Sequence, residues 1–107
     1  MNLSCDLKKA VKVSYLDGNF FTGDSYPISV TVTDNGEPAS ISGSVSAFVI
    51  KDDNSMSTIT GGSVSGNVVT ITIPGTALDV PGRVSIAVRL TTGSTVTTLA
   101  VLVANIF

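Results

Sequence analysis

Apolar and polar residues alternate along most of this chain with a period of two, the spacing of a strand that buries one face. In the clearest stretch, residues 27–33, the apolar Ile28, Val30 and Val32 alternate with hydroxyl side chains. The pattern predicts seven strands, at residues 10–16, 27–33, 45–51, 56–59, 68–73, 83–90 and 95–103. We expect no helix beyond a single turn near residues 76–78, between two Pro-Gly pairs.

Turn-forming residues separate these strands. Asn35-Gly36, for example, tolerates the positive φ angles of a tight hairpin turn. Short strands at regular spacing with such turns predict one all-β domain over residues 1–107, a single immunoglobulin-like antiparallel β-sandwich of about seven strands. A small β-barrel is the structural alternative. Residues 1–9 precede the first predicted strand and are interpreted as a flexible or docking N-terminal arm.

Composition supports the strand assignment and excludes several functions. Val, Ile and Thr, whose branched Cβ atoms favour strands, make up 36 of the 107 residues. The net charge is −2, so the chain lacks the basic surface typical of nucleic-acid binding. There is one cysteine, Cys5, so no internal disulfide can form and the fold must rest on its core.

Candidate catalytic and metal-binding residues are weak. The chain has no histidine, and its many serines and threonines therefore lack the usual activating base. Asp52-Asp53-Asn54 offers oxygen ligands, but a calcium loop normally places them at alternate positions and adds a distant carboxylate. We interpret this run as a turn. The sequence predicts no enzyme, no cofactor and no metal site.

Two features bear on location. Residues 1–10 lack the apolar core of a secretory signal, so we expect synthesis in the cytoplasm. No stretch approaches the roughly 18 consecutive apolar residues of a membrane span, so no membrane association is expected.

Two predicted strand segments, residues 45–51 and 99–103, carry apolar groups on both faces, whereas a solitary sandwich should leave one face wet. In the usual order of this fold, these strands flank the strand at residues 83–90 in one sheet. Apolar groups around an arginine are typical of protein interfaces. The alternative is that loops or termini cover this face. The predicted interface residues are Phe48, Ile50, Ala87, Arg89, Leu99, Val101 and Phe107.

An ordered series of motifs resembles a family of phage virion domains. The series is ISVTVTDNGEP, ISGSVSAFVIKDDNS, GSVSGNVVTITIP, ALDVPGRVSIAVRL and TTLAVLVANIF. It is similar to the N-terminal domain of phage baseplate upper proteins (BppU) and to the short base domains of phage head-fibre proteins. The sequence departs from that pattern at Ser40-Ile41, where the family usually has Asp-Leu, and at Asp52-Asp53-Asn54, where it usually has an Asp-Gly turn.

The resemblance implies a structural role in the virion, with no catalytic residues to carry over. Long members continue into a stalk or receptor-binding region. Because this chain stops at Phe107, we expect an attachment module, either a capsid-decoration or head-fibre base domain. The alternatives are a baseplate anchoring domain and a surface adhesin or carbohydrate-binding sandwich. The expected partners are other virion proteins and further copies of the chain, in a homo-oligomer.

Overall fold

The computed structural model describes residues 2–7, 13–15 and 20–107, and this part of the chain is all β apart from one short 3₁₀ turn. Its elements are β1 (Asn2–Asp6), β2 (Val13–Tyr15), β3 (Tyr26–Asp34), β4 (Glu37–Pro38), β5 (Ser44–Ile50), β6 (Met56–Ser65), β7 (Val68–Ile73), the 3₁₀ turn η1 (Gly75–Ala77), β8 (Gly82–Thr92) and β9 (Thr95–Ile106). The all-β prediction is confirmed, and each predicted region contains a strand. Residues 10–12 and 16 of the first predicted strand lie outside the described residues.

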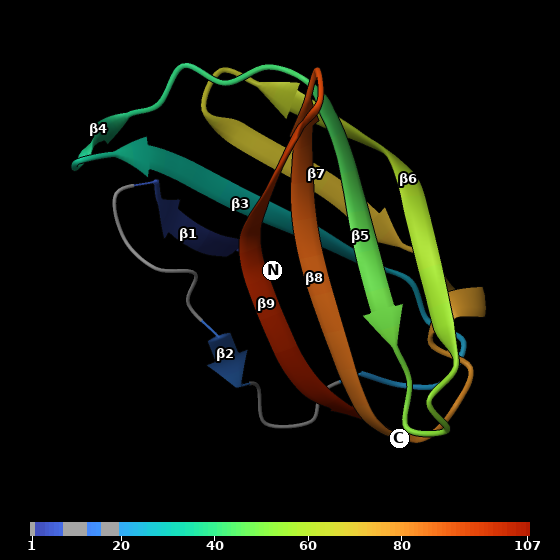
Figure 1. Cartoon of the computed structure of the whole chain (residues 1–107). Helices are drawn as coiled ribbons and strands as arrows, with labels where there is room; N and C mark the ends of the chain where they lie inside the picture. Colours follow the sequence, from blue (N-terminus) through green and yellow to red (C-terminus); the bar gives the residue numbers. More distant parts are fainter. Residues whose placement is uncertain (1, 8–12, 16–19) are drawn as a thin grey trace.

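The strands form one continuous sheet in the order β1-β3-β7-β6-β5-β8-β9-β2, with β4 paired to β3. Figure 1 shows β5, β8 and β9 side by side, with β3 crossing behind them. The sheet curls until it is nearly closed, so it is barrel-like and is not confirmed as an immunoglobulin sandwich. Most neighbouring strands pair antiparallel, as predicted, but β1 pairs with β3 and β2 with β9 in parallel.

The curled sheet has two walls, one that contains β3 and β7 and one that contains β5, β8 and β9. Strand β6 turns the corner between them. Its first half pairs with β5 and its last three residues pair with β7. Gly61 has a φ of +89°, and a Cβ built on Gly62 would lie 2.7 Å from the Cβ of Val45. The two glycines therefore let the strand bend and pass close to β5. The predicted strand at residues 56–59 ended too early because these glycines indicated a break.

The core lies between the walls. Alternate side chains of β3, β5, β7, β8 and β9 point inward, and the described residues bury no polar or charged side chain. Removal of apolar surface from water is the main force that holds such a core together. The largest fully buried side chains are Phe20, Ile28, Ile73, Leu78, Ile86, Leu99 and Leu102.

The N-terminal residues 2–6, which sequence analysis assigned to a flexible or docking arm, are a strand of the sheet. Leu3 and Cys5 on β1 pack against the core. Asp6 accepts hydrogen bonds from the backbone N–H of Asn35 (3.1 Å) and of Gly36 (2.9 Å), the two residues of the β3–β4 turn. Both turn residues have positive φ, as the sequence predicted. One carboxylate thus joins β1 to that turn.

Replacing Asp6 with asparagine should weaken this connection. An amide has one acceptor oxygen in place of two and would turn an N–H₂ group toward a backbone donor. We expect the free energy of unfolding to fall by about 1–2 kcal/mol, measured by urea denaturation. The control is Asp24→Asn, an exposed acidic side chain. Equal denaturation midpoints for the two variants would show that the Asp6 bonds contribute nothing to stability.

Candidate docking surface

The three strands predicted to share a sheet do so, with β8 between β5 and β9. Phe48 lies opposite Ala87, and Ala87 lies opposite Val101, so these side chains form one row across the wall. Their alternate neighbours point into the core. We call the solvent side of this wall the outer face; its described apolar and charged residues are Phe48, Ile50, Met56, Arg83, Ala87, Arg89, Val96, Val101 and Val103.

Part of the outer face is open to solvent. Ile50 is 43% exposed and Met56, its partner on β6, is 60% exposed. Phe48, Ala87 and Val101 are half-buried. Met56 was missing from the predicted interface, because the weak alternation at residues 56–59 did not indicate which face it would take. The described loops and termini therefore leave a continuous apolar area uncovered at the β5–β6 edge.

Arg89 is the charged residue at the middle of the outer face, whereas Arg83 lies near the start of β8. Its guanidinium carbon lies 4.8 Å from the centre of the Phe48 ring, which is cation–π geometry. The side chain is half-buried, and its Nε atom is buried without a hydrogen-bond partner among the described residues. Among the described residues, the Phe48 ring is therefore the contact that holds this guanidinium in place.

Leu99 was wrongly placed on the outer face. It is 1% exposed and belongs to the core. The cause is a β-bulge, since the register between β8 and β9 shifts by one residue between Val88 and Arg89. Val88 lies opposite Ala100, while Arg89 lies opposite Thr98. Leu99 falls in the bulge and joins Ala100 inside, a change of face that strict alternation cannot anticipate.

Phe107 is 62% exposed but lies at the end of the chain, beside Phe21. The two rings have their centres 6.1 Å apart. The backbone of Phe107 donates to the Phe20 carbonyl, and its own carbonyl accepts from the N–H and the hydroxyl of Thr22. Phe107 therefore belongs to a second apolar cluster, with Phe21. The exposure of Phe21 was not predicted from the sequence, because most aromatic residues were assigned to the core.

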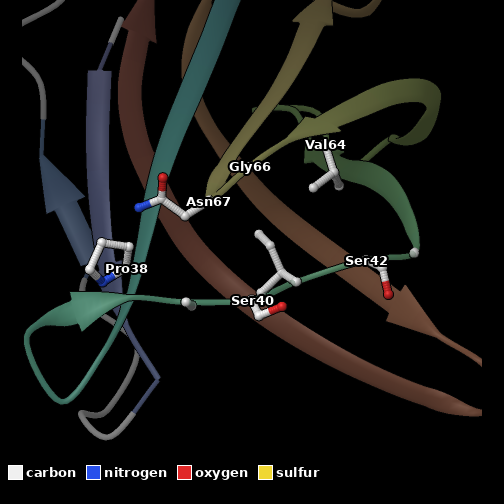
Figure 2. Close-up of a pocket in the computed structure, with 9 residues that line it drawn as sticks. Pro38, Ser40, Ser42, Val64, Gly66 and Asn67 are labelled. Carbon is white, nitrogen blue, oxygen red and sulfur yellow. The ribbon is translucent and has the colours of Figure 1, made fainter.

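A groove of about 750 Å³ lies between the segment that leads into β5 and the β6–β7 hairpin. Figure 2 shows Val64 on one side and the segment with Ser40 and Ser42 on the other. Asn67 is engaged, since its amide donates to the carbonyl of Val32 at 3.0 Å. The lining contains no charged or aromatic side chain, so the groove offers neither acid–base chemistry nor a stacking platform for sugars.

The side chains of Asp52 and Asp53 stabilise the turn after β5 by accepting hydrogen bonds. Asp53 accepts hydrogen bonds from the hydroxyl and the N–H of Ser55, and these bonds lower the pKa of the Asp53 carboxyl. Asp52 accepts from the N–H of Arg83 at 3.3 Å. No three metal-ligating side chains gather anywhere in the described ranges.

Cys5 and Lys51, the other candidate reactive side chains, lie in environments that stabilise the fold. Burial, with a smaller effect from Asp6, raises the pKa of the Cys5 thiol, which makes it a poorer nucleophile at neutral pH. Lys51 pairs with Asp79 at 2.9 Å, and its hydrogen bond lowers the pKa of that carboxyl. Residues 2–7, 13–15 and 20–107 include no helix long and apolar enough to cross a bilayer.

Comparison with known proteins gives a structural match. No family model matches the sequence, and no curated protein matches it. Among solved structures, the chain is similar to the N-terminal domain of phage TP901-1 ORF48, the baseplate protein BppU, with a TM-score of 0.55 and 12% sequence identity. The match covers 99% of this chain and 94% of that one. The two proteins share a fold.

Proposed function

We propose that the protein is a structural component of a phage virion, which docks onto a scaffold of other virion proteins through the outer face. The observation that carries the proposal is the open apolar area around Ile50 and Met56, with Phe48 and Arg89 beside it. Large apolar groups with an arginine, exposed on a rigid sheet, are typical of protein interfaces. The shared fold with a phage baseplate protein domain supports the choice of a virion.

Within the virion, two locations remain in competition. The sequence resemblance led us to expect a capsid-decoration or head-fibre base domain first and a baseplate domain second. The structural neighbour is a baseplate protein, which favours the second location. Mass spectrometry of purified virions should detect the protein, and an image of the particle should place it at the tail tip or on the capsid. Virions that lack the protein would refute both.

A negative charge introduced into the apolar part of the outer face should block docking. Ile50→Asp and Val101→Asp each place a carboxylate where a partner would remove water, which is costly for an unpaired charge. Because Ile50 is 43% exposed, its variant should remain folded. We expect incorporation into particles to fall by at least about tenfold, equivalent to about 1.4 kcal/mol, measured by quantitative blotting of purified virions.

The matched control is Thr72→Asp on β7. Thr72 is exposed, and its strand belongs to the other wall of the sheet. The same charge there should leave incorporation unchanged. If Thr72→Asp reduces incorporation as much as Ile50→Asp does, the docking surface is elsewhere.

A further inference from the structure

Arg89 sits among neutral residues on the outer face. Along its row, it lies opposite Ser46 on β5 and Thr98 on β9. One row away, its guanidinium packs over Phe48, next to Ala87 and Val101. A positive charge is thus held at the middle of this wall, while the other outward-facing charge on β8, Arg83, lies near the start of the strand.

That charge is unpaired within the described part of the chain. No described carboxylate lies within ion-pair distance of Arg89, and its buried Nε has no acceptor. Lys51, by contrast, has Asp79 at 2.9 Å. The described acidic side chains stand at turns and strand ends, at positions 6, 24, 34, 37, 52, 53 and 79, and none belongs to the outer face.

Docking would bury the charge of Arg89, and the partner must then supply a group that pairs with it. While the face is wet, water solvates the guanidinium, but a partner that covers Phe48 and Val101 also removes that water. A buried charge is tolerated in an interface when it is paired and hydrogen-bonded, and strongly unfavourable otherwise. A guanidinium stacked on an aromatic ring keeps its edge donors for a carboxylate, which it can bind through two parallel hydrogen bonds.

We propose that the outer face recognises a segment of another protein that presents an aspartate or glutamate between apolar residues, with the carboxylate bound by Arg89. The inference rests on the proposed docking function and names its partner chemistry. A second copy of the chain, facing this one through the same surface, would supply no carboxylate, because none of the residues that define the outer face is acidic.

The two arginines of the chain, Arg83 and Arg89, allow a direct test with an internal control. Both lie on β8, and Arg83 is exposed near the start of that strand. In NMR spectra of the purified protein, each gives one Nε–Hε signal. We would titrate the protein with 3-phenylpropionate, an apolar carboxylate, and with 3-phenylpropanamide, its neutral counterpart. At about pH 6, the carboxylate is ionised.

The expected result is a saturable shift of the Arg89 signal with 3-phenylpropionate, with half-saturation at roughly millimolar concentration. The amide should bind at least about tenfold more weakly, because it lacks the charge that pairs with the guanidinium. Arg83 should shift much less than Arg89. In Arg89→Gln, the shifts of Phe48 and Val101 with the carboxylate should fall to those seen with the amide, whereas Arg83→Gln should behave as the unchanged protein.

Three results would overturn the proposal. Equal shifts with the two compounds would show an apolar patch with no carboxylate site. Equal shifts at Arg83 and Arg89 would show attraction of anions to any arginine. Shifts at Arg89 that depend on protein concentration without a probe would show that a second copy covers the face. The virion role is tested independently of the carboxylate site. If the titration fails, the protein can still be detected in virions. If virions lack the protein, the titration can still succeed.

Discussion

Leu99→Asp should unfold the protein, whereas Val101→Asp, two residues along the same strand, should leave it folded. Leu99 is 1% exposed, inside the core. Truncation of a core leucine costs about 2–5 kcal/mol, and a carboxylate adds the penalty of a buried charge. A domain of this length has a total stability of about 5–15 kcal/mol. The Leu99 variant should therefore lose most of its β-sheet signal in far-ultraviolet circular dichroism.

Val101 lies half-buried on the outer face. An aspartate there keeps contact with water, so we expect a loss of about 1–2 kcal/mol and a native spectrum. The two variants are matched in strand, charge and distance along the chain, and differ in the face to which the β-bulge assigns them. Equal thermal stability of the two would contradict the bulge, because regular alternation puts both residues on one side.

Phe20→Ala should strongly destabilise the protein, and Phe21→Ala should hardly affect it. Phe20 is 1% exposed, its ring centre lies 4.4 Å from that of Tyr26, and its backbone bridges to Ile106 at the end of β9. Loss of a core phenylalanine costs about 3–5 kcal/mol. For a domain of this size, the melting temperature should fall by roughly 15 °C or more.

Phe21 is the control, since it is 57% exposed and meets Phe107 at the surface. Its truncation should change the free energy of unfolding by no more than about 0.5 kcal/mol. Thermal denaturation followed by circular dichroism measures both effects. A similar loss in both variants would mean that Phe20 is not the side chain that fixes this segment against the core.

The outer face could be predicted in part because its residues lie on regular strands. Alternation placed Phe48, Ala87, Arg89 and Val101 on one side, and the structure brings them together. Leu99 failed because a bulge inserts one residue and reverses the alternation locally. Such a shift depends on how two strands fit side by side, which the pattern of a single strand does not contain.

The N-terminal strand was not predicted for a related reason. Residues 2–6 are a short segment with only two apolar residues, Leu3 and Cys5, and their strand exists because β3 offers an open edge to pair with. Asp6 then binds the backbone of a turn 29 and 30 residues away. Interactions between segments so distant in sequence leave no local pattern. Their residues look polar and unstructured until the fold brings the partner near.

The sequence by itself determined most of the strands and the tight turn at Asn35-Gly36, because side-chain alternation and turn chemistry are local properties. The grouping of β5, β8 and β9 followed from the usual strand order of the predicted fold. The tertiary structure decided the rest. It made the sheet continuous through Gly61 and Gly62, where missing side chains let β6 bend close to β5. It also left Arg89 over Phe48 without a carboxylate partner among the described residues, because the charges near an arginine depend on which strands are neighbours.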